Sequence, residues 1–158
     1  LEFYPAKIQG YRRYYALELP GGNQLTVVED DEHEVNGLVI TGLNEEQFES
    51  IAATEKGYNI QEVPGKDIDY YVEPDQKPDT VTVFVAGDEA RFNLDTDGRR
   101  NQDYEQFIYR GTEVMADRLF STERGKQRFI EEFLADYRRT TYERHDEEWI
   151  TVEEVDNG

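Results

Sequence analysis

One carboxylate in this sequence stands where proton-transfer chemistry can be organised. A short strand around Gly37 is followed by a helix that opens at Asn44 and ends before Glu55, and Gly57-Tyr58 leads into the next strand. Glu55 therefore leaves an apolar-faced helix at its junction with a strand, which directs its side chain toward the sheet. A carboxyl group buried there is suited to proton transfer, because desolvation favours its protonated form. The alternative is a surface Glu near a helix C-terminus, where the macrodipole disfavours it, and the residues alone favour this alternative.

Other common reaction centres lack their residues. The chain has no Cys, which excludes disulfides, Cys-based zinc sites and Cys nucleophiles. His33 and His145 lie in separate acidic stretches without a spaced partner, so we expect solvated surface side chains and no metal site. Residues 95–98 (Asp-Thr-Asp-Gly) are interpreted as a turn, since Gln106 stands where a calcium loop needs a bidentate acid. No Gly-rich phosphate loop and no Gly-x-Ser-x-Gly motif occurs, and we expect no cofactor.

Negative charge dominates the composition. The 158 residues include 36 Asp and Glu against 17 Lys and Arg, which gives a net charge of −19. Such a surface repels phosphate, so we expect neither nucleic acid nor an anionic membrane as a partner. The acid excess is interpreted either as adaptation to a high-salt (halophilic) cytoplasm or as an ordinary acidic domain. The lack of a visible signal peptide, of a run of about 20 apolar residues and of Cys indicates a cytoplasmic protein.

The elements that would position Glu55 follow from hydrophobic periodicity and turn residues. A capping box of Asn44 and Gln47 opens a helix whose apolar stripe is Phe48, Ile51 and Ala52. The other expected elements are strands at residues 6–19, 25–28, 35–40, 58–63 and 80–86, a turn at 20–23, an acidic loop at 29–34, a long loop at 64–79, and helices around 104–119 and 129–137.

This order of elements indicates the fold class. Strands that precede helices, with one helix interleaved, predict an α+β fold: a small mixed, largely antiparallel β-barrel or sheet flanked by helices. We expect one domain over residues 1–142 and an acidic tail over residues 143–158. Gly37 is expected to mark a bulge or a close approach of two backbones.

The order and spacing of these motifs resemble the gamma-glutamylcyclotransferase-like family. That family reads Ala-x-Leu-x-Gly-Tyr on an early strand, Val-x-Gly on the next, a Leu-rich helix running into Glu-Gly and Tyr, and a later Tyr before Gly-Ala at a helix. The matching residues here are Ala6-Lys7-Ile8-Gln9-Gly10-Tyr11, Val35-Asn36-Gly37, Leu43, Glu55-Lys56-Gly57-Tyr58, and Tyr104 followed by Gly111-Thr112. The resemblance covers residues 6–137.

The resemblance implies an amine-releasing cyclotransferase that acts on a small gamma-glutamyl compound. The alpha-amine of the substrate would attack its own gamma-carbonyl, which gives 5-oxoproline and expels an amine. Glu55 would act as general acid/base, taking the amine proton and passing it to the leaving nitrogen. Tyr58 and Tyr104 would orient the substrate through their hydroxyls. Nothing in the sequence indicates an oligomeric state.

A non-catalytic member of the same fold is the alternative. The family's upstream strand and its Tyr-Gly-Ser-Asn loop, whose backbone donors hold the gamma-glutamyl group, have no counterpart before Ala6. Phe84 also stands where catalytic members usually carry Tyr. The chain would then be a binding or structural module that has lost its substrate loop, and we expect weak turnover or none from these residues.

Overall fold

The strands are organised around one long antiparallel pair. The computed structural model describes residues 1–17, 24–55, 57–87, 102–135, 140–145 and 148–153. Three sheets form, with strand orders β2-β1-β4, β3-β5 and β6-β7, and every pairing is antiparallel. The strands are β1 (Glu2–Leu17), β2 (Gln24–Thr41), β3 (Asn59–Pro64), β4 (Ile68–Tyr70), β5 (Thr80–Val85), β6 (Thr140–His145) and β7 (Glu148–Glu153).

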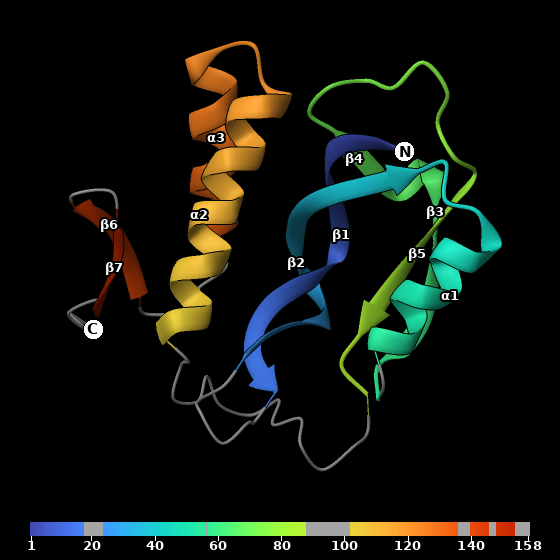
Figure 1. Cartoon of the computed structure of the whole chain (residues 1–158), viewed down its shortest axis with the longest axis horizontal. Helices are drawn as coiled ribbons and strands as arrows, with labels where there is room; N and C mark the ends of the chain where they lie inside the picture. Colours follow the sequence, from blue (N-terminus) through green and yellow to red (C-terminus); the bar gives the residue numbers. More distant parts are fainter. Residues whose placement is uncertain (18–23, 56, 88–101, 136–139, 146–147, 154–158) are drawn as a thin grey trace.

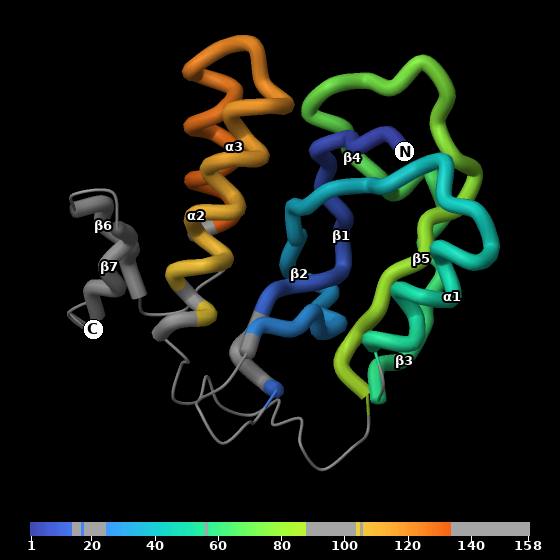
Figure 2. The backbone as a smooth tube through the Cα atoms, viewed as in Figure 1, coloured from blue at the N-terminus to red at the C-terminus, as the bar shows by residue number. Residues whose placement is uncertain are grey.

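The β1–β2 pair lies between two helices on one side and the second sheet with α1 on the other. Figure 1 shows α2 and α3 on one side of this pair, and α1, β3 and β5 on the other. The same division is visible in the backbone trace of Figure 2. The helices are α1 (Glu45–Thr54), the short 3-10 turn η1 (Gly65–Asp67), α2 (Gln102–Leu119) and α3 (Glu123–Ala135).

The α+β class and the largely antiparallel sheets are confirmed, but the described strands close no barrel. β2 and β5 belong to separate sheets. They are joined by the backbone hydrogen bond from Ala86 N to the Val27 carbonyl oxygen at 2.8 Å. This bond lies just beyond the end of β5 and does not continue as a ladder. The edges of β2 and β5 therefore flank an open space instead of sealing it.

The expected acidic loop at residues 29–34 is wrong, because this stretch is part of β2. Glu29 pairs with Tyr11 and Glu34 with Gln9, so the intervening acidic residues bulge from a continuous strand. Gly10, with a φ of +89°, stands opposite at the register shift, where glycine is favoured. Side chains of the neighbouring strand offset the charge: Arg12 lies 3.3 Å from Asp30 and Lys7 lies 3.5 Å from Glu34.

The expected long loop at residues 64–79 also contains regular structure. It begins with η1 and then forms β4, whose Ile68 and Tyr70 pair with Ile8 and Ala6 of β1. Three residues are too few to show the alternation that identifies a strand. The buried Ile68 joins Ala6, Val39 and Val63 in the core between the first two sheets.

The second part of the core lies between α2, α3 and β2. Tyr109 and Phe133 are its buried residues, and Leu25, Tyr104 and Ile108 pack against them. Helical spacing of Tyr104, Phe107 and Ile108 does not by itself identify the buried face of α2, because Phe107 is 74% exposed while Tyr109 is 1% exposed. Tertiary packing turned the helix toward the face that carries Tyr109.

The structure does not test two expected turns or the expected domain boundary. The turns expected at residues 20–23 and 95–98 lie outside the described residues. The extent of the domain and of the acidic tail stays a prediction; β6 and β7 occupy residues on both sides of the expected boundary. No helix among the described residues is both long and apolar enough to cross a lipid bilayer.

Candidate functional site

The helix that leads to Glu55 is built by local signals. Asn44 caps α1 by accepting a hydrogen bond from Gln47 N at 2.8 Å, and Gln47 Oε1 accepts one from Asn44 N at 2.9 Å. The expected capping box is thus confirmed. The expected stripe also faces inward: Phe48, Ile51 and Ala52 are half-buried. Phe48 stacks on Phe84 of β5 with ring centroids 6.3 Å apart, which fixes α1 against the second sheet.

A tight turn then places Glu55 beside Tyr58. Glu55 is the C-cap of α1, and its N–H donates to the Ala52 carbonyl oxygen at 3.1 Å. Tyr58 N donates in turn to the Glu55 carbonyl oxygen at 3.2 Å. Gly57 has a φ of +86° in this turn, a conformation that favours glycine. Glu55 and Tyr58 therefore emerge from the two ends of one turn between α1 and β3.

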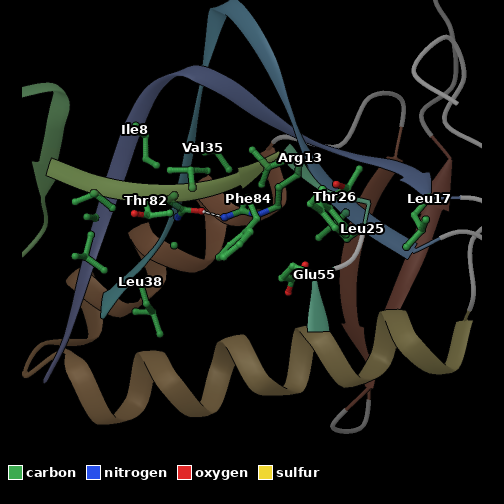
Figure 3. A pocket seen from close by; sticks show the side chains of 18 of the residues that line it. Ile8, Arg13, Leu17, Leu25, Thr26, Val35, Leu38, Glu55, Thr82 and Phe84 are labelled. Carbon is green, nitrogen blue, oxygen red and sulfur yellow. Dashed lines mark hydrogen bonds between the residues drawn. The ribbon is translucent and has the colours of Figure 1, made fainter. Parts of the chain in front are cut away.

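The three side chains singled out in the sequence line one cavity. It has a volume of about 640 Å³, and Glu55, Tyr58 and Tyr104 are all on its wall. Figure 3 labels Glu55, Thr82 and Phe84 among the side chains that line this cavity, the last two from β5. Glu55 is partly buried. The volume is in the range of small-molecule sites.

The lining residues place the cavity along two strands. Consecutive residues of β2, from Val35 to Val39, and of β5, from Val81 to Phe84, all border it. A strand that presents one face to a cavity would contribute alternate residues. The cavity thus runs along the edges of β2 and β5, in the space that the unclosed sheets leave between them.

Tyr104 shows that the three groups interact. The pKa of Tyr104 is raised above its usual value, first because burial disfavours the phenolate, and then because Tyr58 and Glu55 add negative potential nearby. A hydrogen bond with the Leu25 backbone acts in the opposite direction. Tyr104 therefore remains a neutral phenol at physiological pH, which keeps its hydroxyl able to donate a hydrogen bond.

The Val35-Asn36-Gly37 segment serves two different purposes. Its three residues all border the cavity. The Asn36 side chain also reaches α3, where Nδ2 donates to the Phe129 carbonyl oxygen at 2.9 Å. The expectation for Gly37 is wrong, because a Cβ there would meet no atom within 4 Å and its pairing with Ala6 is regular. Gly111 lies in the interior of α2 rather than at its start.

Two residues of the cavity wall escaped the sequence analysis. Arg13 and Thr26 are both 5% exposed and both border the cavity. The guanidinium of Arg13 stacks on the Phe133 ring at 3.8 Å and donates to Asn36 Oδ1 at 2.6 Å. The sequence does contain a signal for both residues. Arg13 and Thr26 are polar residues within strands rich in apolar residues, and one face of such a strand must be buried.

A second polar cluster fastens α3 to β1. Glu132 lies 3.0 Å from Lys7 Nζ, accepts a hydrogen bond from Arg128 Nε at 2.8 Å, and accepts another from the Tyr71 hydroxyl. Burial alone would raise the pKa of Glu132, but the hydrogen bonds from Tyr71, Arg128 and Lys7 outweigh it and lower the pKa. Burial, followed by the bond to Glu132, raises the pKa of Tyr71.

The described residues hold no group of three or more acidic or His side chains placed to share a metal ion. His33 pairs through Nδ1 with Asp30 at 3.0 Å on the exposed bulge of β2. The side chain of His145 lies outside what the structure describes.

No protein-family model matches the chain, and no curated protein matches it. The structure is similar to the solution structure of At5g39720.1 from Arabidopsis thaliana, with 21% sequence identity and a TM-score of 0.41. The match covers 74% of this chain and 76% of that chain.

Proposed function

We propose that this domain binds a gamma-glutamyl compound in the cavity and releases its amine by intramolecular cyclisation. The observation that carries the proposal is that Glu55, Tyr58 and Tyr104 all line that cavity. The first two residues are neighbours through a turn, but Tyr104 comes from α2, far along the chain. The resemblance to the gamma-glutamylcyclotransferase-like family selects the same three residues for the same chemistry.

The reaction needs one group that moves a proton and others that hold the substrate. The alpha-amine nitrogen forms a bond to the gamma-carbonyl carbon, and the bond from that carbon to the leaving nitrogen breaks. The Glu55 carboxylate takes the proton that the attacking amine loses and delivers it to the leaving nitrogen, so the protein ends unchanged. Tyr58 and Tyr104 hold the substrate folded, and the cyclisation gains rate because both reactants belong to one molecule.

A non-catalytic binding module is the second candidate, and Phe84 is the observation that favours it. Phe84 borders the cavity and stacks on Phe48, so it offers an apolar ring where a Tyr would offer a hydroxyl. A module of this kind would bind the gamma-glutamyl group without releasing 5-oxoproline.

Release of 5-oxoproline from gamma-glutamyl amides tests the two candidates. We expect slow release by the wild-type chain and a loss of about 10²–10⁴-fold in kcat for Glu55→Gln, the usual contribution of a general acid/base. Glu45→Gln is the matched control, since Glu45 is exposed in the first turn of the same helix and does not border the cavity. Equal rates for wild type and Glu55→Gln would refute the role of Glu55. If the protein binds 5-oxoproline but forms none from gamma-glutamyl amides, the binding module is favoured.

A further inference from the structure

The polar groups of the proposed reaction lie at one end of the cavity. Asn59, which follows Tyr58, pairs with Val85 at the end of β5. The next residue of the chain, Ala86, donates from its N–H to the Val27 carbonyl oxygen at 2.8 Å. Tyr58 therefore stands at the end of the cavity where β2 and β5 meet.

Glu55 and Tyr104 belong to the same end. Glu55 is held there by the turn in which its carbonyl oxygen accepts the hydrogen bond from Tyr58 N. Tyr104 hydrogen-bonds with the backbone of Leu25, two residues before Val27 on β2, and it feels the negative potential of Glu55. The proton transfer of the proposed function is therefore confined to the end where β2 and β5 meet.

The opposite end of the cavity is apolar. Val81 precedes Val85 by four residues on β5, which is about 13 Å along an extended strand. Val81 and Val83 are half-buried, and both border the cavity while they pack against the buried core. Val39 of β2 belongs to that core and also borders the cavity. Hydrocarbon side chains of both strands therefore line this end.

The apolar end offers no charge to a ligand. Among the described residues that line the cavity, Glu55 and Arg13 are the charged ones. The guanidinium of Arg13 is engaged with α3, because it stacks on the Phe133 ring at 3.8 Å and donates to the Phe133 carbonyl oxygen at 3.2 Å. An anion beside Val81 would lose water without gaining a cation, whereas a hydrocarbon chain would gain free energy by leaving water.

The position of Glu55 orients the substrate. Glu55 has to reach both the attacking amine and the leaving nitrogen, so the gamma-glutamyl group lies where β2 and β5 meet. The substituent on the leaving nitrogen then extends along β5 toward Val81. We propose that the apolar end receives this substituent, so that the released amine is an alkylamine with a hydrocarbon chain and no carboxylate. This inference rests on the proposed function and deepens it, since the acid/base chemistry alone would release an amino acid equally well.

Three substrates test the hydrocarbon chain and the carboxylate separately. gamma-Glutamylpentylamide has four more methylenes than gamma-glutamylmethylamide, and each methylene taken out of water contributes about fourfold, so its kcat/KM should be about 100-fold higher. gamma-Glutamylnorleucine is the pentylamide with a carboxylate added on the carbon next to the leaving nitrogen. Its kcat/KM should lie at least about 10-fold below that of the pentylamide. Similar values for the methylamide and the pentylamide, or for the pentylamide and gamma-glutamylnorleucine, would overturn the inference.

Val81→Thr tests the place of the chain. The variant puts a hydroxyl into the apolar end at nearly constant volume, and it should lower kcat/KM for the pentylamide by about 5- to 10-fold, because the bound chain would bury that hydroxyl without a partner. The methylamide is too short to reach Val81 and should be unaffected. Val114→Thr is the matched control, since Val114 is 48% exposed on α2 and does not border the cavity. The ratio of the two substrates is measured within one protein, so it does not depend on how much of the variant folds. An unchanged ratio in Val81→Thr would contradict the assignment.

Calorimetric binding of the pentylamide and the methylamide separates this inference from the proposed function. Turnover that depends on Glu55 but does not distinguish the two amides would overturn the inference and leave the proposed function standing. Tighter binding of the pentylamide, without release of 5-oxoproline that depends on Glu55, would support the apolar end and overturn the proposed reaction. Absence of both binding and release would overturn both.

Discussion

Asn36→Ala tests whether one amide side chain holds α3 against the first sheet. Asn36 is 5% exposed, and its Oδ1 accepts a hydrogen bond from Arg13 Nη2 at 2.6 Å. Its Nδ2 donates to the Phe129 carbonyl oxygen at 2.9 Å and to the Tyr71 hydroxyl at 3.2 Å. Alanine removes all three bonds, and the buried Arg13 guanidinium loses Asn36 Oδ1 as an acceptor.

The expected loss follows from the kind of each bond. A hydrogen bond to a charged group contributes about 1.5–3 kcal/mol and each of the two neutral ones about 1 kcal/mol, so Asn36→Ala should lower the free energy of unfolding by about 3.5–5 kcal/mol. Domains are usually stable by about 5–15 kcal/mol, so this is a large fraction of the total. Asn44→Ala is the matched control, because Asn44 is exposed and caps α1, and losing such a cap costs about 1 kcal/mol.

Urea unfolding followed by far-UV circular dichroism measures both changes. The midpoint for Asn36→Ala should fall well below that for Asn44→Ala while the slope stays the same. Equal losses for the two variants, or a loss below about 1.5 kcal/mol for Asn36→Ala, would refute the reasoning. Should Asn36→Ala not fold, Tyr71→Phe removes the hydroxyl that Asn36 reaches and should lower stability by about 1 kcal/mol or more.

Acid, backbone packing and salt test other parts of the structure. The bonds that lower the pKa of Glu132 stabilise the fold fully above its unfolded value near 4.5, and that stability is lost as the pH falls through the lower folded value. Between about pH 6 and pH 3, the free energy of unfolding measured in urea should therefore fall less for Glu132→Gln than for wild type. An equal fall in both proteins would contradict this. Gly87→Ala should lower the melting temperature because its Cβ would overlap the Gly57 carbonyl oxygen, whereas Gly111→Ala, which meets open space, should stabilise α2 by about 1 kcal/mol. If the net charge of −19 opposes folding, melting temperatures should rise from low to molar KCl, and a flat series would remove the halophilic interpretation.

Short-range features were readable in the sequence because their partners are close along the chain. The capping box of Asn44 and Gln47 joins residues one helical turn apart, and the structure has both of its bonds. Glu55 and Tyr58 are brought together by a single turn, with Gly57 in the backbone conformation that glycine favours. Hydrophobic periodicity, turn residues and the resulting order of elements were enough to give the α+β class.

Only the tertiary structure decided which distant groups meet. The acidic stretch from Glu29 to Glu34 looked like a solvated loop, but cations of β1 and the pairing with that strand make it part of β2. The direction of the Asn36 side chain, and the meeting of Tyr104 with Glu55, depend on how α2 and α3 pack on the sheet. Periodicity along a chain specifies which face of an element is apolar. It does not specify which element will cover that face, because the covering element is chosen by the shape and polarity of surfaces that exist only after the strands have paired.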